Sequence, residues 1–282
     1  KVHDNTADFG VTEANLLGAA IPITGMAGDQ QAATVGQACF EPGMVKATYG
    51  TGCFALLNTG DKPVRSTNKL LTTIAYRLNG QTTYALEGSI FTAGAAVQWL
   101  RDGLGIIKRA GDIEALALQL PDHGGVEFVP ALTGLGAPHW APDARGTLSG
   151  LTRGTGRAHI ARATLDAMAL QNADILRAME SDLGKRMRPL RVDGGAAANN
   201  LLMQIQADVL GRKLIRPQVI ETTVAGACYL AGLGVGLWQS PAEVRKIWQA
   251  EREFSSAISV AARRARLASW DRALRRTLLP QE

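Results

Sequence analysis

The sequence predicts an α/β fold, in which a group of strands is followed by helices that alternate with further strands. Four strand-like runs follow one another between residues 44 and 86, and Gly-containing turns separate them. From residue 91 onward the apolar residues recur at helical spacing instead. Short apolar runs at 190–192 and 213–216 lie between helical segments, which is the α/β plan. We interpret this order as a ribonuclease-H-like lobe.

The composition is that of an ordinary globular protein. The chain has 282 residues, of which 46% are apolar and 20% charged, enough for one large domain or two. The net charge of +5 is modest and arises largely near the C-terminus, so we expect no nucleic-acid partner. No apolar run approaches the ~20 residues of a membrane helix, and no signal-peptide pattern is present. We therefore expect no membrane span.

Cysteine usage bears on the compartment. The three cysteines, Cys39, Cys53 and Cys228, are scattered and form no CxxC pair. This pattern disfavours a disulfide framework or a zinc site and indicates a reducing compartment, the cytoplasm. The four histidines also lack ligand spacing, so no metal ligands are predicted from the residues.

The first elements lead to an isolated carboxylate. Residues 1–20 show weak periodicity and are expected to form a loop, and 21–24 a short buried strand that ends at a Gly-rich turn. Asp29 follows this turn, and a small-residue helix is predicted over 30–38. At this position Asp29 is suited either to acid–base chemistry or to capping the helix. Both interpretations stay open on these residues alone.

The next four elements are predicted strands: Met44–Tyr49, Cys53–Asn58, Leu70–Leu78 and Thr82–Leu86. The dipeptide Asn79-Gly80, between the last two, is typical of a two-residue hairpin turn. The simplest arrangement for such closely spaced runs is a meander of antiparallel strands.

Helical periodicity dominates the rest of the chain. A helix is predicted over 91–101, and a second over 112–120 with Asp112 as its cap. A strand at 126–132 leads into a Gly- and Pro-rich loop over 133–150, of a length that is more often functional than connective. The remaining predicted elements are helices at 159–179, 198–210, 223–234, 241–248 and 257–278, a strand at 190–192 and an edge strand at 213–216.

Two glycine-containing turns stand at predicted strand ends. Gly50-Thr51-Gly52 is the tip between two strands, where backbone N–H groups and the Thr51 hydroxyl can face phosphate oxygens. Asp193-Gly194-Gly195 joins a strand to a helix, where glycine lets the backbone approach a ligand closely. Taken alone, each tripeptide is more typical of an ordinary turn. The GxxxxGK[ST] motif is absent, which excludes a P-loop protein.

Asp29 is the best candidate for acid–base chemistry in the chain. A carboxylate can accept the proton of an alcohol as its oxygen attacks a γ-phosphoryl group. Together with a tip loop suited to phosphate, this carboxylate points to a phosphotransferase.

Several long segments of the chain are distinctive as a set. They are GMAGDQQAA (25–33), KATYGTGCF (46–54), ALEGSIFTAGAAVQWLRDGLG (85–105), FVPALTGLGAPHW and ARGTLSGLTRGT (both within 128–155), and RVDGGAAANN (191–200). Together they resemble one family, the FGGY carbohydrate kinases, and in particular its members that phosphorylate glycerol. The resemblance extends from about residue 21 to about 238 and weakens after about 250.

The resemblance implies an actin-like, two-lobed fold with ATP in the cleft between the lobes. It also implies the transfer of phosphate from ATP to glycerol, giving sn-glycerol 3-phosphate and ADP, with Mg²⁺. Gln30-Gln31 after the aspartate favours glycerol over pentoses, since xylulose kinases usually carry Asn there. The alternatives are another FGGY polyol or sugar kinase, and a non-catalytic actin-like ATP-binding module. Retention of Asp29 argues against the latter.

Family roles transfer to particular positions of this chain. By resemblance, Asp29 is the general base on the glycerol hydroxyl, Gln30 is a glycerol ligand and Phe54 packs on the glycerol carbons. The residues implied in ATP binding are Thr51, Gly94, Gln98, Gly195 and Asn199.

The chain resembles only the second half of such a kinase. Residues 1–37 resemble the end of the first lobe, 38–250 the second, ATP-side lobe, and 251–282 a C-terminal helical extension. The missing N-terminal lobe is therefore an expected partner, without which we expect no turnover. Gly18-Ala19-Ala20 stands where members inhibited by fructose 1,6-bisphosphate carry an arginine-containing loop, so that regulation is not expected. The sequence leaves open whether the protein is a homo-oligomer.

Overall fold

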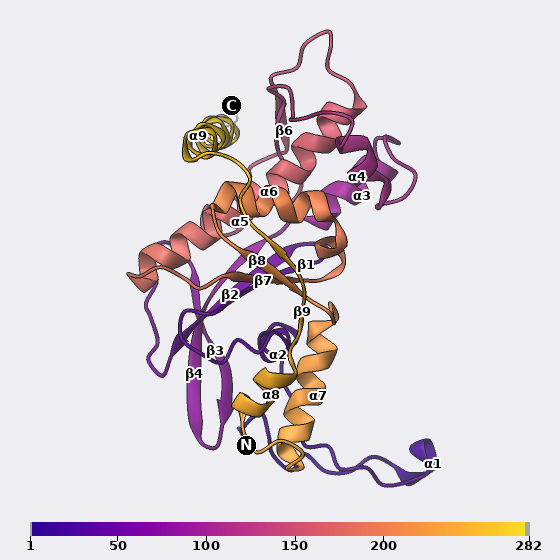
Figure 1. Cartoon of the computed structure of the whole chain (residues 1–282), viewed down its shortest axis with the longest axis vertical. Coiled ribbons are helices and arrows are strands. Elements are labelled where there is room, and N and C mark those ends of the chain that lie inside the picture. The colour runs from indigo at the N-terminus through magenta and orange to yellow at the C-terminus, as the bar shows by residue number, and fades with distance from the viewer. Residues whose placement is uncertain (1, 280–282) are drawn as a thin grey trace.

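The computed structural model describes residues 2–279 and centres on one seven-stranded mixed sheet (Figure 1). The strand order across the sheet is β3-β4-β2-β1-β7-β8-β9. Two short strands, β5 and β6, form a separate pair. The strands are β1 Val45–Tyr49, β2 Cys53–Gly60, β3 Leu71–Leu78, β4 Gln81–Ile90, β5 Glu127–Val129, β6 Thr147–Ser149, β7 Leu190–Asp193, β8 Leu214–Pro217 and β9 Ala250–Phe254.

The first four strands pair antiparallel, as predicted, but they do not form a simple meander. Strand β4 lies between β2 and β3, so the order predicted for a meander is wrong. The segment 61–70 is long enough to carry the chain past β4's position to the sheet edge before β3 begins. The hairpin expected at Asn79-Gly80 is confirmed, and both residues have the positive φ angles, 51° and 75°, that a type I′ turn requires.

The other half of the sheet contains parallel strands. Strands β1, β7 and β8 run parallel, and β2 is antiparallel to both of its neighbours. The order β4-β2-β1-β7-β8 is that of a ribonuclease-H-like lobe.

The prediction of β8 as an edge strand is wrong, because β9 pairs antiparallel with its outer side. The sequence pattern missed β9 because four of its five residues are exposed, which leaves no apolar alternation. The domain boundary expected between residues 250 and 251 falls inside this strand.

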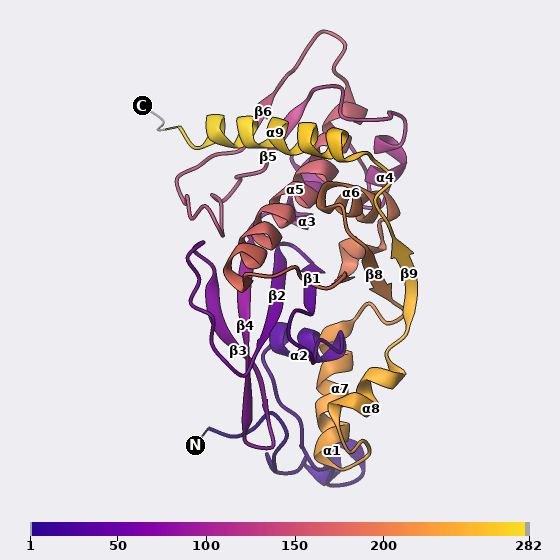
Figure 2. The same cartoon turned by 60° about the vertical axis from the view of Figure 1, so that its left-hand side comes forward.

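Helices cover both faces of the sheet (Figures 1 and 2). Helices α5 and α6 pack on one face, and their apolar side chains join those of β1 and β7 in the main core. Helices α2 and α7 pack on the opposite face, in a smaller cluster with β2 and β3. The helices are α1 Ala14–Leu17, α2 Asp29–Gly36, α3 Gly94–Asp102, α4 Asp112–Ala117, α5 Arg157–Leu183, α6 Asn200–Leu210, α7 Thr222–Gly234, α8 Pro241–Ile247 and α9 Val260–Thr277, with a 3₁₀ turn at Gly195–Ala198.

Glycines allow α2 and α7 to approach closely. A Cβ atom on Gly36 would lie 1.9 Å from the carbonyl oxygen of Thr222, and one on Gly226 would lie 1.8 Å from that of Ala32. Any side chain at either position would therefore push the two helices apart. This close contact fixes α2, and the residues at its start, against α7.

Two local predictions are wrong. Residues 21–24 do not form a buried strand, since Ile21 is 46% and Ile23 38% exposed. Instead of entering the sheet, this segment makes one isolated bridge, Val11 to Pro22, with the preceding loop, and the next residue, Gly25, makes another with Thr6. Asp112 does not cap α4, because Gly111 takes the capping position and the Asp112 carboxylate accepts the Arg109 N–H at 2.9 Å.

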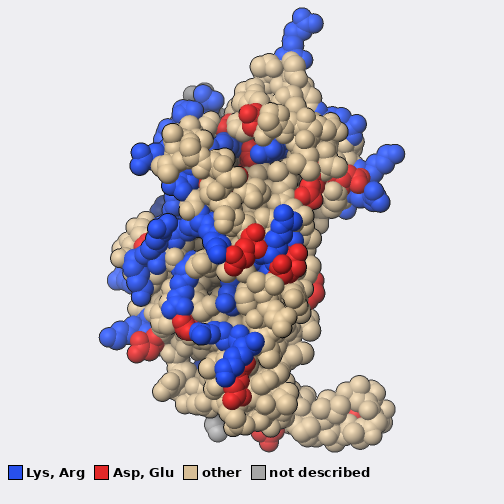
Figure 3. All heavy atoms as spheres, viewed as in Figure 1, with Lys and Arg blue, Asp and Glu red and all other residues tan. Residues whose placement is uncertain are grey.

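The C-terminal helix α9 lies across α6 and β5 and places its basic residues mainly toward solvent. Trp270 and Leu274 of this helix are buried. In Figure 3 basic side chains gather along one side of the molecule, with acidic side chains interspersed among them. None of the helices described within residues 2–279 is long and apolar enough to cross a membrane.

The cysteines are all free thiols. Cys39 and Cys53 are buried in the lobe, and burial raises the pKa of Cys39 to about 12 and raises that of Cys53 further. Cys228 is exposed on α7.

Candidate functional site

Helix α2 presents the predicted base at its first residue. Asp29 is exposed and its Oδ1 atom accepts the backbone N–H of Gln30 at 2.8 Å. The alternative in which Asp29 caps the helix is wrong, because Gly28 takes the capping position. An exposed carboxylate is a group that can accept a proton from a substrate hydroxyl.

A buried lysine contacts the residue next to this carboxylate. Lys46 lies on β1 with no exposed surface, and its Nζ atom donates to Oε1 of Gln30 and, at 2.9 Å, to Oγ1 of Thr48. The Nε2 atom of Gln30 lies 3.5 Å from Oδ2 of Asp29. The Gln30 carboxamide thus stands between the lysine and the carboxylate.

Two more carboxyl groups face this lysine. Burial lowers the pKa of Lys46, and the negative charges of Asp193 and Glu87 oppose that shift. Burial raises the pKa of Asp193, which the Lys46 charge opposes, and Oδ2 of Asp193 accepts a 2.6 Å hydrogen bond from Gln37. Burial likewise raises the pKa of Glu87, with Lys46 opposing the shift and Asp29 adding to it. The amino group of Lys46 therefore lies among acidic side chains.

Phe54 lies on the same face of the sheet as this group. It pairs with Thr48 across β1 and β2, and Lys46 pairs with Leu56 two residues along. Residues directly opposite in an antiparallel pair share a face. The structure therefore places all three predicted substrate residues, Asp29, Gln30 and Phe54, on the α2 side of the sheet.

A cavity of about 370 Å³ lies near the other end of β1. Its lining comes from the tip loop, α3, the start of α4, α5 and the segment 195–202, and the α5 residues Leu165 and Met168 supply apolar surface. The structure brings together here all five residues that the resemblance assigned to ATP: Thr51, Gly94, Gln98, Gly195 and Asn199.

The tip loop is held against the start of α3. The Gly94 N–H donates to the carbonyl of Gly50 at 3.0 Å, and the Ala95 N–H donates to that of Thr51 at 3.0 Å. A Cβ atom on Gly94 would lie 2.5 Å from the Gly50 carbonyl oxygen, so only glycine permits this contact. The loop is thereby fixed at the cavity mouth.

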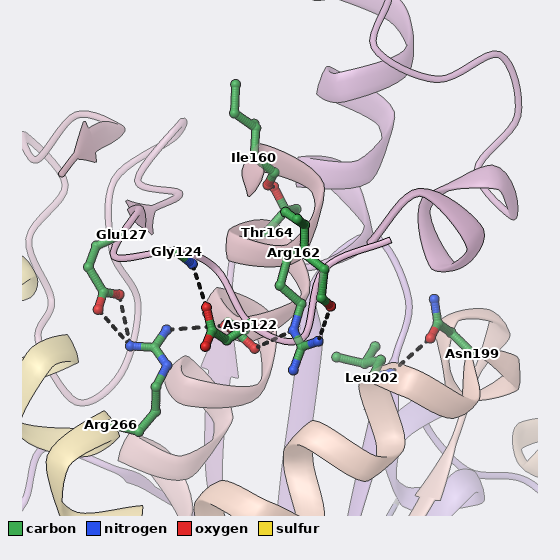
Figure 4. A network of polar contacts seen from close by, with 11 residues as sticks. Asp122, Gly124, Glu127, Ile160, Arg162, Thr164, Asn199, Leu202 and Arg266 are labelled. Carbon is green, nitrogen blue, oxygen red and sulfur yellow. Dashed lines mark hydrogen bonds and ion pairs between the residues drawn. The ribbon is translucent and has the colours of Figure 1, made fainter. Parts of the chain in front are cut away.

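The opposite wall begins at the second glycine turn. Gly194 has a φ of +84°, and a Cβ there would lie 2.6 Å from the Tyr49 carbonyl oxygen. Asn199 caps α6, and its Oδ1 atom accepts the Leu202 N–H at 2.8 Å (Figure 4). The Arg216 guanidinium donates to the Ala197 carbonyl at 2.7 Å and so holds the turn between them.

The sequence reasoning missed two features of this region. Glu114 and Arg101 line the cavity, but no motif or family role in the sequence pointed to either residue. Lys46 was missed because it reads as a single polar position in a strand. The available signal was its place within Met44–Tyr49, where its neighbours in the sequence, Val45 and Ala47, are apolar and an unpaired lysine is seldom buried.

No group of three or more His, Cys, Asp or Glu side chains suited to a metal ion occurs in the part of the chain that the structure describes.

Comparison with known proteins places these residues in a family context. A family model for the C-terminal domain of the FGGY family of carbohydrate kinases matches residues 45–235. This range includes the tip loop, the cavity lining and both glycine turns.

Curated relatives match nearly the whole chain. A glycerol kinase from Aromatoleum aromaticum is 61% identical over 276 residues, which are 98% of this chain and 56% of the relative. A glycerol kinase from Bdellovibrio bacteriovorus is 59% identical over 274 residues, 96% of this chain and 55% of the relative. The chain thus spans about half the length of the curated relatives it matches.

Solved structures agree. The Plasmodium falciparum glycerol kinase with ADP matches with a TM-score of 0.90 at 39% identity, over 99% of this chain and 56% of that one. A ligand-bound xylulose kinase from Lactobacillus acidophilus matches with a TM-score of 0.80 at 21% identity, over 98% and 56%, which is a likeness of fold alone. The predicted fold, a ribonuclease-H-like lobe of the actin-like sugar kinases, is confirmed.

Proposed function

The chain belongs to the FGGY family of carbohydrate kinases, and on that premise we propose that it forms the nucleotide-side half of an enzyme that phosphorylates glycerol with ATP. The products are sn-glycerol 3-phosphate and ADP. One observation carries the proposal: five residues from three separate segments, Thr51, Gly94, Gln98, Gly195 and Asn199, surround a single cavity. That cavity opens beside the tip loop between β1 and β2, and Asp29 begins α2, a helix that packs on the same sheet.

The choice of glycerol rests on likeness to the relatives and on the substrate-side residues. The curated relatives with 56% to 61% identity bear the name glycerol kinase. Gln30 supplies a carboxamide that can donate to one hydroxyl oxygen and accept from another. Phe54 offers an apolar ring on the same face, which suits the carbon chain of a small polyol.

In the proposed reaction Asp29 accepts the proton of the attacked hydroxyl. The hydroxyl oxygen forms a bond to the γ-phosphorus of ATP while the bond from that phosphorus to the β-phosphate oxygen breaks. The proton passes to the Asp29 carboxylate, and ADP leaves. Positioning and charge stabilisation supply most of the rate in such transfers, so the tip loop contributes by fixing the phosphates.

ADP and ATP occupy the cavity between α3 and α6 in this proposal. The phosphates lie toward Thr51, and the adenosine lies toward Gly195 and Asn199. Leu165 and Met168 give the apolar surface that a base requires.

Mg²⁺ is expected with the nucleotide, because a divalent cation neutralises the charge that develops on the phosphates. The residues described here form no metal cluster. Each step above is therefore assigned to the chain's own groups.

We further propose that turnover needs an N-terminal half like the one that the relatives carry before the matched segment. Residues 1–37 belong in this view to the junction with that half, and the enzyme works in the cytoplasm.

Replacing the proposed base tests the function. In the full-length enzyme, Asp29→Asn should lower kcat with glycerol by about 10²- to 10⁴-fold, the usual contribution of a general base. The dissociation constant for ATP, measured by calorimetry, should change by no more than about twofold. The matched control, Asp61→Asn at an exposed position, should leave both quantities within about twofold.

Three outcomes would contradict the proposal. If the Asp29→Asn enzyme kept its turnover, Asp29 would not be the general base. In a panel of polyols and sugars, a preference of the full-length enzyme for a pentulose would replace glycerol as the substrate. No turnover with any of them would favour the binding-module alternative.

A further inference from the structure

The proposed phosphotransfer makes no use of the buried lysine beside its substrate residues. We propose that Lys46 is a positioning residue, which acts on the substrate site by fixing the orientation of the Gln30 carboxamide. This inference rests on the proposed function, because it assigns a role to Gln30 in substrate binding.

Lys46 is held in place by the sheet, independently of Gln30. It has no exposed surface, its Nζ atom donates to Oγ1 of Thr48 at 2.9 Å on the same strand, and it faces the Asp193 and Glu87 carboxyl groups. Lysine is almost never fully buried unless it is paired. These neighbours keep the ammonium group at one place next to α2.

The lysine selects one of the two orientations of the Gln30 amide. An ammonium group has only donors, so it must face the carbonyl oxygen Oε1 and not the Nε2 amino group. Nε2 then points toward Asp29, where it lies 3.5 Å from Oδ2. Rotated by half a turn, the amide would instead set Oε1 against the Asp29 carboxylate.

The orientation matters because the two ends of an amide have opposite roles. With Nε2 pointing toward Asp29, Gln30 presents a hydrogen-bond donor beside the acceptor carboxylate of Asp29. A substrate hydroxyl placed there can accept from Gln30 while it donates to Asp29. Without Lys46 nothing determines which end of the Gln30 amide faces Asp29, since the oxygen and nitrogen ends of an amide have nearly the same shape.

A purely structural role for Lys46, as the counter-ion of Asp193, makes a different prediction. In that case its loss would act on the sheet and would affect the enzyme whether or not Gln30 is present. The two roles are therefore separable by combining substitutions at Lys46 and Gln30.

The test is a double-mutant cycle in the full-length enzyme, with kcat and KM for glycerol measured for Lys46→Met, Gln30→Ala and the double variant. Lys46→Met alone should lower kcat/KM by about 10- to 100-fold, the usual effect of losing a partner that orients a ligand-binding group. In the Gln30→Ala background the same change should cost less than about threefold. ATP affinity should stay within about twofold.

Two further variants serve as controls. Lys46→Arg keeps a donor-only side chain, so it should retain the amide orientation and restore most of the activity lost in Lys46→Met. Lys213→Met removes an exposed lysine that pairs with Glu253, and it should leave kcat/KM within about twofold. Denaturant unfolding of each variant shows whether it is folded, and Lys46→Arg still decides the question if Lys46→Met does not fold.

An equal loss from Lys46→Met in both backgrounds would overturn the inference, as would unchanged kinetics of Lys46→Met. If Gln30→Ala itself retained full activity with glycerol, the proposed function would lose its substrate ligand. That failure is visible before the Lys46 comparison is made, so the two failures are distinguishable.

Discussion

Gly94 lies where the first turn of α3 meets the tip loop between β1 and β2. Its backbone N–H donates to the Gly50 carbonyl, and the space that a Cβ would need is taken by that carbonyl oxygen. The residue is therefore required for shape and not for any chemistry of its own.

Gly94→Ala should displace the tip loop and weaken nucleotide binding. Overpacking at such a contact costs about 1–3 kcal/mol, which corresponds to a rise of about 5- to 150-fold in the Kd for ADP. Calorimetric titration of ADP measures this change. Gly154→Ala, where the nearest atom would be in ordinary contact at 3.8 Å, should bind ADP like the unaltered protein. Equal affinities of all three proteins would show that the tip loop does not depend on this contact.

At the scale of elements, the pair formed by α2 and α7 fixes the substrate side of the site. Gly226→Ala would place a Cβ 1.8 Å from the Ala32 carbonyl oxygen, so the helices must separate. We expect the free energy of unfolding to fall by about 3 kcal/mol, measured by urea denaturation.

The control for this prediction is Gly111→Ala, a position where an added Cβ would meet no atom within 4 Å. It should change the unfolding free energy by less than about 0.5 kcal/mol. If Gly226→Ala were no more harmful than this control, the close approach of α2 and α7 would contribute little to stability.

The elements that the sequence predicted well are those with a strong local pattern. The α5 helix carries sustained apolar periodicity, and the Asn79-Gly80 turn has its own conformational signal. Strand β9 has neither, since its place is decided by pairing with β8. The order of β3 and β4 was also out of reach, because local patterns do not encode which strand edge a chain returns to.

For the candidate site, the same limit applies to Lys46. The resemblance assigned the five cavity residues by motif, and the structure shows them lining one space. The contact between Lys46 and Gln30 joins residues on different elements, and no spacing in the sequence indicates it. The α/β plan itself followed from the order of strand and helix patterns alone.

At the scale of the whole molecule, ion pairs with buried carboxylates attach α9 to β5 and α5. Arg266 donates to both carboxylate oxygens of Glu127, at 2.7 and 2.9 Å (Figure 4). It also lies 3.6 Å from the Asp166 carboxylate. Trp270 adds a 2.7 Å hydrogen bond to Asp174 on α5. These contacts attach the C-terminal helix to both α5 and β5.

Arg266→Met should destabilise the protein by about 3 kcal/mol at neutral pH, because it leaves the buried Glu127 carboxylate without its ion-pair partner and Asp166 with Arg162 alone. Burial already raises the pKa of Asp166, and Arg266 is the main charge that opposes this shift. A carboxyl group with a raised pKa in the folded state is destabilising when ionised, and the penalty disappears as the pH falls below that pKa. The deficit of Arg266→Met should therefore shrink at mildly acidic pH.

Urea denaturation of the variant and the unaltered protein at both pH values measures this dependence. Arg264→Met, which removes an exposed arginine of the same helix, should lie within about 0.5 kcal/mol of the unaltered protein at each pH. A deficit of Arg266→Met that grew on acidification would contradict the proposed cause.

Strand β1 gives the two sides of the site a common scale. Lys46, which contacts the substrate-side residue Gln30, and Tyr49, which precedes the tip loop, are residues of this one short strand. At ~3.3 Å per residue they are about 10 Å apart along it. A strand in the middle of a sheet does not change length, so it acts as a ruler between the proton acceptor and the phosphate cradle. A conformational change that brings ATP and glycerol together must therefore move the bound molecules relative to β1. A distance measured between probes on α2 and on the tip loop should be the same before and after that change.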